Sequence, residues 1–217
     1  MRRPWRWGRR LALALVLLLV AALLAVAPAL TKWDYGNLTS RAGWQLPDRV
    51  IESLGIQPGE RAADVGAGDG YFTFRLAEAV GPTGKVYAVE VDEELVAELE
   101  RNARAGGHDN VVVVKGEYAD PLLPDGELDL VLFCNSYHHI EDRVAYFDRL
   151  RSDLTEGGRV ALIDLKASLL VRLLAPHDHW TTVETMREEM ERASYTFAGR
   201  FDYLPAQNFA VFQPTPR

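Results

Sequence analysis

The chain has 217 residues, a net charge of −7, 48% hydrophobic residues and a single cysteine. This length suits one domain of ordinary size with an appendage. One cysteine excludes a disulfide scaffold and any zinc or iron–sulfur site built from several cysteines. The acidic balance argues against nucleic acid as a partner, and the 10% of aromatic residues argues against disorder.

The charge is distributed unevenly along the chain. Residues 1–32 contain six basic residues and no acidic ones, so all 31 acids lie in the remainder. Within this leader, an unbroken run of Leu, Ala and Val at 11–27 continues past Pro28 to Leu30. About 20 apolar residues cross the core of a bilayer, so residues 11–30 predict an N-terminal hydrophobic helix that anchors the chain in a membrane. A cleaved signal peptide is the alternative, since Ala27-Pro28-Ala29 loosely fits a cleavage site.

We divide the chain into the leader at 1–32, a connector at 33–46 and a soluble body at 47–217. In the body, short apolar strands alternate with helices, and glycine-containing turns separate them. This alternation predicts an α/β domain with a doubly wound, mostly parallel sheet that is covered on both faces. Strands are expected at 61–65, 85–91, 111–115, 128–134, 159–164, 197–203 and 209–212. Helices are expected at 47–55, 71–80, 92–105, 142–154 and 182–193.

The turn after the first strand is rich in glycine. In an open parallel sheet, ligands bind beyond the carboxyl ends of the strands, so the turns there form the candidate site. This turn reads Asp64-Val65-Gly66-Ala67-Gly68-Asp69-Gly70. Its glycines let the backbone approach a ligand closely, and the next helix offers N–H groups to an anion such as a carboxylate. The spacing differs from the dinucleotide pattern, because Tyr71 stands where that pattern has its third glycine.

Acidic residues follow the next two strands. Glu90 ends an apolar strand about 20 residues after the glycines, where a carboxylate would bind the two hydroxyls of a ribose. Asp92 competes for this role, but it is well placed as the N-cap of the next helix, so we assign the ribose to Glu90. After the third strand, Glu117 is either an ordinary turn acid or an acceptor for the amino group of a base.

These features together resemble the class I S-adenosylmethionine-dependent methyltransferases, in particular their small-molecule enzymes. The resemblance rests on the segments 64–70, 86–90, 116–117, 128–131 and 154–160, although Thr155-Glu156 replaces the usual Lys-Pro or Arg-Pro. It covers about residues 45–214, the whole soluble body. It implies a Rossmann-like methyltransferase fold, with a seven-stranded sheet that ends in an antiparallel hairpin.

The same resemblance implies S-adenosyl-L-methionine as the cofactor. The glycine turn would hold its methionyl part, Glu90 the ribose, and Glu117 with Tyr118 the adenine. The predicted cofactor-binding residues are Asp64, Gly66, Ala67, Gly68, Gly70, Glu90, Glu117, Tyr118 and Asn135. A nicotinamide-dependent oxidoreductase built on a related sheet is the alternative.

Histidines gather in the segments after the fourth and fifth strands, where the methyl acceptor would lie. The first segment contains His138 and His139, and the second contains His177 and His179. They are structural residues, metal ligands or general bases, and the candidates for catalysis are His138, His139 and His179. No spacing here matches a known metal motif, so no metal is predicted. Cys134 ends an apolar strand and is expected to be a small buried hydrophobe rather than a nucleophile.

The sequence therefore predicts a bacterial methyltransferase that transfers a methyl group by in-line displacement to a small or lipid-like acceptor. Residues 11–30 would hold it at the inner membrane. Because the basic residues precede the apolar run, the positive-inside rule places the body outside the cytoplasm, whereas the supply of the cofactor favours a body inside it. A non-catalytic module that binds the cofactor and signals to a membrane partner is a further alternative. The sequence leaves the oligomeric state and the acceptor atom open.

Overall fold

The computed structural model describes residues 40–166 and 180–216. In this part of the chain, the strands form one seven-stranded sheet in the order β3-β2-β1-β4-β5-β7-β6. The strands are β1 (Arg61–Val65), β2 (Lys85–Glu90), β3 (Val111–Lys115), β4 (Leu128–Cys134), β5 (Leu154–Leu165), β6 (Tyr195–Phe201) and β7 (Gln207–Pro214). Neighbouring strands are parallel, except that β7 runs antiparallel to both β5 and β6. The mostly parallel sheet that the sequence predicts is confirmed.

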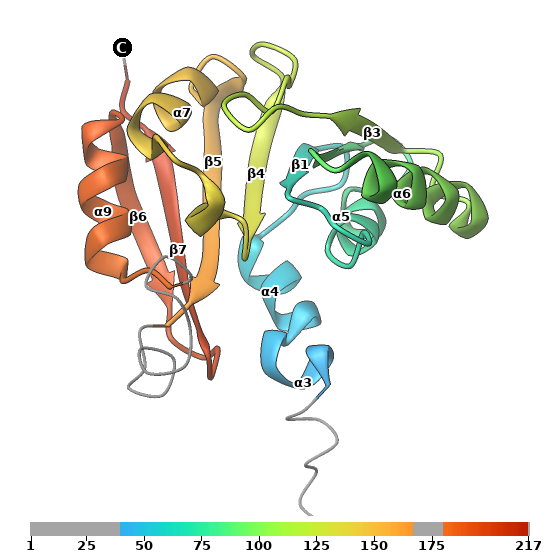
Figure 1. Ribbon diagram of the computed structural model, residues 1–217, viewed down its shortest axis with the longest axis horizontal. Coiled ribbons are helices and arrows are strands. Elements are labelled where there is room, and N and C mark those ends of the chain that lie inside the picture. Colours follow the sequence, from blue (N-terminus) through green and yellow to red (C-terminus); the bar gives the residue numbers. More distant parts are fainter. Residues whose placement is uncertain (1–39, 167–179, 217) are drawn as a thin grey trace, which may run out of the picture. The chain divides into compact units, whose positions relative to one another are not determined.

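Helices pack against both faces of the sheet (Figure 1). The helices of the described residues are α3 (Arg41–Gln45), α4 (Pro47–Leu54), α5 (Thr73–Val80), α6 (Glu93–Gly106), the short 3-10 helix η1 (Tyr137–His139), α7 (Arg143–Leu150) and α9 (Val183–Arg192), and those from α4 onward belong to the domain that contains the sheet. In β4, Val131 and Phe133 join the core formed with α7 and α9, whereas Leu130 and Leu132 join the core formed with α4 and α5. Alternate residues of the strand thus serve opposite faces, as in a sheet that is buried on both sides.

The helix ends follow local signals in the sequence. Asp92 caps α6, because its side chain accepts hydrogen bonds from the backbone amides of Glu94 and Leu95. The prediction that Asp92 has this structural role is therefore confirmed. Helix α4 begins at Pro47 and is followed by Gly55, whose φ of 63° lies in the left-handed region that favours glycine.

Several predicted boundaries move. Helix α7 ends at Leu150 instead of 154, because Leu154 already pairs with Leu128 of β4 at the start of β5. Helix α5 begins at Thr73 instead of 71, because the glycine turn continues through Gly70, which has a φ of 90°. The first closing strand begins and ends two residues earlier than expected, at 195–201, and the second is longer than expected and spans 207–214.

The predicted membrane anchor at 11–30 lies outside the described residues, as do His177 and His179. Among the residues that are described, none of the helices combines the length and the apolar character that a membrane span requires.

Candidate active site

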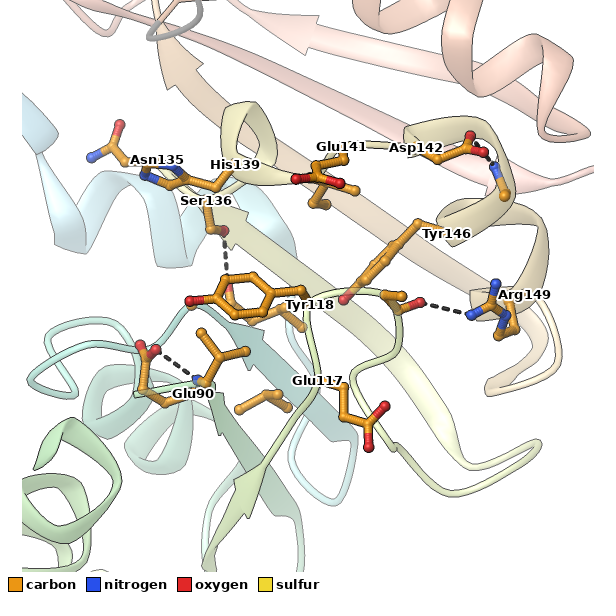
Figure 2. Close-up of a pocket in the computed structure, with 17 residues that line it drawn as sticks. Glu90, Glu117, Tyr118, Asn135, Ser136, His139, Glu141, Asp142, Tyr146 and Arg149 are labelled. Carbon is orange, nitrogen blue, oxygen red and sulfur yellow. Dashed lines mark hydrogen bonds between the residues drawn. The ribbon is translucent and has the colours of Figure 1, made fainter. Parts of the chain in front are cut away.

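A cavity of about 780 Å³ lies at the carboxyl edge of the sheet. Its walls come from the ends of β1, β2 and β4, from the loop after β3, and from the segment that leads into α7 (Figure 2). This is the edge at which parallel sheets bind their ligands, so the cavity is the candidate site.

The glycine turn after β1 meets the loop after β4 at very short range. A Cβ atom on Gly66 would lie 2.5 Å from the Cβ atom of Ser136, and Gly66 has a φ of 79°. The hydroxyl of Ser136 donates a hydrogen bond to the carbonyl oxygen of Val65 at 2.5 Å. Only glycine fits at position 66, and its absence of a side chain lets the two loops form one wall of the cavity.

Glu90 at the end of β2 is held by the backbone on three sides. Its Oε2 atom accepts a hydrogen bond from the amide of Gly68 at 3.0 Å. Its Oε1 atom accepts from the amides of Val91 at 2.7 Å and Asp92 at 3.3 Å. The residue is 8% exposed and lines the cavity. The carboxylate is therefore fixed in place before any ligand arrives.

Asp64 stabilises the glycine turn from a buried position behind it. It is 2% exposed, and its Oδ2 atom accepts a hydrogen bond from the hydroxyl of Thr73 at 2.7 Å. This bond ties the end of β1 to the first residue of α5. Asp64 does not line the cavity, and neither do three other members of the predicted set, Ala67, Gly68 and Gly70.

The loop after β3 forms a tight turn with an aromatic side chain at its tip. The amide of Glu117 donates to the carbonyl of Asp120 at 2.8 Å, and the reverse bond measures 3.2 Å. Tyr118 at the tip is 77% exposed, although it lines the cavity. Arg149 of α7 donates to the carbonyl of Ala119 at 2.7 Å, so the turn is tied to the opposite wall.

Asn135 follows β4 and adopts a left-handed backbone conformation with a φ of 58°. Its amide donates to the carbonyl of Ile163 at 2.8 Å, which links it to β5. Its side-chain oxygen accepts a hydrogen bond at 2.8 Å from the side-chain amide of Gln207, which is fully buried at the start of β7. The structure thus brings Asn135 to the cavity together with Gly66, Glu90, Glu117 and Tyr118.

The two adjacent histidines occupy different environments. The Nδ1 atom of His138 lies 2.8 Å from the Oδ1 atom of Asp164, and both side chains are almost completely buried. His139 lines the cavity instead. In the described part of the chain, no group of three or more His, Cys, Asp or Glu side chains is arranged to hold a metal ion. His179 lies outside the described residues.

The 3-10 helix that carries these histidines is clamped from α7 and α9. The hydroxyl of Tyr137 donates a hydrogen bond to Glu189, and burial together with this acid raises the pKa of the phenol above its ordinary value. Arg143 donates to the carbonyl of Tyr137 at 3.1 Å and forms an ion pair with Glu189 at the same distance. These contacts fix the wall that contains His139.

Helix α7 contributes residues that the sequence analysis missed. Asp142, Ala145, Tyr146 and Arg149 all line the cavity. Their spacing of three and four residues places them on one face of a helix, and that periodicity is the signal that could have identified them. Burial, together with the charge of Asp120, raises the pKa of Tyr146, so its hydroxyl stays protonated.

Comparisons with known proteins agree with this architecture. Residues 56–203 match the family model described as a methyltransferase domain. The chain is 30% identical over 109 residues to demethylmenaquinone methyltransferase of Geobacillus stearothermophilus, and this match covers 50% of the chain and 47% of that relative. It is 33% identical over 138 residues to 27-O-demethylrifamycin SV methyltransferase of Amycolatopsis mediterranei, and this match covers 61% of the chain and 48% of that relative. The chain thus spans about half the length of the curated relatives that it matches.

The fold has a counterpart among solved structures. A SAM-dependent methyltransferase from Aquifex aeolicus superposes with a TM-score of 0.73 over 81% of this chain and 94% of that one, at 24% sequence identity. Because the identity is low, this likeness describes the fold.

The family implies S-adenosyl-L-methionine as the cofactor, and the residues present fit that group. The region around Gly68 is open, since a Cβ atom there would meet nothing within 4 Å. Beside it, the fixed carboxylate of Glu90 faces a cavity whose other walls include Glu117 and Asn135. The match to the family model extends over more than half of the sequence. The chain therefore belongs to the methyltransferase domain family.

Proposed function

We propose that the chain is an S-adenosylmethionine-dependent methyltransferase that acts on a small-molecule acceptor. The observation that carries this proposal is Glu90, whose carboxylate is held by three backbone amides at the end of β2 and lines a cavity of about 780 Å³. A carboxylate at this position suits the two hydroxyls of a ribose.

The charges around the cavity favour this cofactor over a dinucleotide. Among the described residues that line it, the acids are Glu90, Glu117, Glu141 and Asp142. Arg149 is the one arginine or lysine in this lining, and it lies 3.9 Å from Asp120. An acidic cavity attracts a cationic sulfonium and repels a pyrophosphate. The cavity therefore argues against the nicotinamide-dependent alternative.

The protein's own part in the reaction is mainly to position the reactants. S-adenosyl-L-methionine, when bound, supplies a methyl group that its sulfonium has already activated. Glu90 fixes the ribose end, and the clamped loop after β4 holds the wall beside it. His139 lies on that wall and is the described histidine that could take a proton from an acceptor whose own proton is hard to lose.

We further propose that the acceptor is lipid-like and is met at the membrane surface. Relatives are named for the methylation of demethylmenaquinone and of 27-O-demethylrifamycin SV, which are both small molecules. The apolar run at 11–30 would keep the enzyme near such an acceptor. Because the cofactor is made in the cytoplasm, we place the body there. A reporter that is active only in the periplasm, fused to the C-terminus, tests this placement, and strong reporter activity would overturn it.

Calorimetric titration of the full-length chain in detergent tests the core of the proposal. S-adenosyl-L-methionine should bind the wild type, and Glu90→Gln should bind it about 10- to 100-fold more weakly, because charged hydrogen bonds are lost. Glu93→Gln is the matched control. Glu93 is the first residue of α6, is exposed, and forms an ion pair with Lys115 at the end of β3. Absence of binding, or tighter binding of NADH, would refute the proposal.

Turnover separates the enzyme from a non-catalytic module. The full-length chain should transfer a radiolabelled methyl group from the cofactor to a member of a panel of demethylated quinones and phenols. Cofactor binding without transfer to any member of the panel would favour the module that only binds and signals.

A further inference from the structure

Strand β3 leaves one edge of the sheet open. It pairs with β2 and stands last in the strand order, so its other side pairs with no strand of the described residues. Residues 111–114 of this strand are four consecutive valines, and Val112 is 38% exposed. An open apolar edge of this kind is a template for pairing with another strand.

The opposite edge of the sheet is protected against such pairing. In β6 the register with β7 shifts between Phe197 and Gly199, and Arg200 forms an ion pair with Asp202 at 3.2 Å. A bulge and exposed charges both hinder the addition of a further strand. Residues 111–114 of β3 contain neither feature, so the two edges differ in what they admit.

The backbone of β3 determines which of its residues face the open side. The amide of Val86 donates to the carbonyl of Asn110 at 2.9 Å, and the amide of Gly116 donates to the carbonyl of Glu90 at 3.1 Å. Successive residues of a strand direct their backbone groups to opposite sides, so the even-numbered residues of β3 bond to β2. The odd-numbered residues from 111 to 115 therefore face the open edge.

Charge selects one register for a second copy of the same strand. Two antiparallel copies of β3 must match odd-numbered residues with odd-numbered ones, because these face the open edge. With Val112 opposite its own counterpart, Asp109 of each copy lies opposite Lys115 of the other, and such pairs are stabilising. The next register in one direction places Asp109 opposite Glu117, which has the same sign, and the next in the other direction places Lys115 opposite Gly107.

Both charged residues of this register are accessible. Asp109 is exposed and lines a groove of about 310 Å³ formed by α6 and β3, in which Arg104 is paired with Glu100 at 3.2 Å. Asp109 itself pairs with no cation in the part of the chain that the structure describes. Lys115 contacts Glu93 at 3.1 Å, but this ion pair is exposed and therefore weak. Lys115 can thus turn to a second acid.

We propose that β3 pairs antiparallel with β3 of a second copy of this chain, with Val112 on the twofold axis and Asp109 opposite Lys115 of the other copy. This symmetric contact covers the valines and joins the two sheets into one. None of residues 109–115 lines the cavity that contains Glu90. The inference is therefore independent of the proposed function.

Disulfide cross-linking of the full-length chain in detergent tests the register. Residues that face each other without hydrogen bonds have Cα atoms about 4.5 Å apart, which a disulfide can bridge. Val112→Cys should therefore form a covalent dimer under mild oxidation. Val113→Cys should form about tenfold less, because in this register it faces Val111 and lies too far from its own counterpart. The wild type, whose single cysteine is Cys134, should form none. Equal cross-linking at 112 and 113 would overturn the register.

Sedimentation velocity of the full-length chain in detergent tests the association itself. The wild type should be a dimer, and Val112→Lys should associate about tenfold more weakly, because two lysines would face each other across the axis. Thr196→Lys is the matched control, since Thr196 is an exposed residue of β6 at the protected edge. It should associate like the wild type. A monomeric wild type, or equal association of Val112→Lys and the wild type, would show that the inference is wrong.

A charge exchange provides the rescue experiment. Asp109→Lys should weaken the dimer, because it places two cations opposite each other at both ends of the paired strands. Lys115→Asp should weaken it in the same way with two anions. The double variant restores opposite charges and should associate like the wild type. Failure of the double variant to recover would overturn the pairing of these two residues.

Discussion

Asp164 holds His138 at two points. Its Oδ2 atom accepts a hydrogen bond from the backbone amide of His138 at 3.0 Å, and its Oδ1 atom lies 2.8 Å from the Nδ1 atom of the ring. The same carboxylate also accepts from the amide of Leu165 at 2.8 Å. A fully buried acid at the end of β5 thus determines the course of the loop after β4, and with it the position of His139.

Removal of this acid should destabilise the fold. Asp164→Ala leaves the amides of His138 and Leu165 and the His138 ring without their buried acceptor. We expect a loss of about 2–4 kcal/mol in the free energy of unfolding, measured by urea denaturation. Asp164→Asn keeps an acceptor oxygen and should lose less. Equal stability of Asp164→Ala and the wild type would show that the loop is held by its other contacts.

Substitution of the two histidines should have different effects. His139→Gln should lower turnover by about 100-fold and change the affinity for the cofactor little, because it removes a base at the cavity wall. His138→Gln should mainly lower stability, since His138 binds Asp164. The matched control is His108→Gln, because His108 stacks on Phe74 and does not line this cavity. Steady-state kinetics across pH provides the readout, and unchanged turnover in His139→Gln would mean that the acceptor needs no base there.

Two glycine substitutions in one turn should differ in cost. Gly66→Ala forces a Cβ atom to within 2.5 Å of the Cβ atom of Ser136 and should cost several kcal/mol of stability, about 2–4, measured by denaturation. In Gly68→Ala the new Cβ atom meets nothing within 4 Å. This variant should therefore lose only about 1 kcal/mol of stability, because alanine is strained in the left-handed backbone conformation of this position. Because its new methyl group occupies open space beside Glu90, Gly68→Ala should fold and yet bind the cofactor weakly. Comparable stabilities for the two variants would contradict the close contact of Gly66 with Ser136.

Asp153 should make stability depend on pH. Burial raises the pKa of Asp153 to about 6, a hydrogen bond from Ser152 lowers it, and the charges of Asp120 and Asp125 raise it. Between the ordinary pKa near 4 and this raised value, the folded state binds more protons than the unfolded state, so stability falls as pH rises.

Asp153→Asn should abolish this dependence. The variant should be more stable than the wild type at pH 7 by about 2 kcal/mol, and the two should converge below pH 4. Urea denaturation at a series of pH values measures the difference. A constant gap between the two proteins across this range would refute the assignment to Asp153.

The sequence carries enough information to predict the sheet and the position of Glu90 at the carboxyl end of one of its strands. Runs such as Leu128–Cys134 are apolar except for Asp129, which is the pattern of a strand buried on both faces, and Glu90 ends a similar run. Local rules also predicted the capping role of Asp92, because an Asp directly before a helix favours the N-cap position.

Tertiary contacts decide what local patterns leave open. His138 and His139 are adjacent, yet the rotation of one 3-10 turn directs the first to Asp164 and the second to the cavity. From the sequence alone Tyr146 is expected to be an ordinary core aromatic. Only the packing of α7 shows that it also lines the cavity. Gln207 is distant in sequence from Asn135 and contacts it only because β7 pairs with β5. The roles of the predicted site residues in binding and catalysis stay predictions.

The reversed direction of β7 has a consequence for how this fold can diversify. Because β7 runs against its neighbours, the connection at 202–206 returns to the edge of the sheet where Lys166 follows β5, and the Lys166 amine donates to the carbonyl of Leu204 at 2.6 Å. The carboxylate of Glu90 is anchored on the other side of β4, by amides of the turns after β1 and β2. Changes in the length or sequence of the connection at 202–206 can therefore be accommodated without altering the hydrogen bonds that hold Glu90.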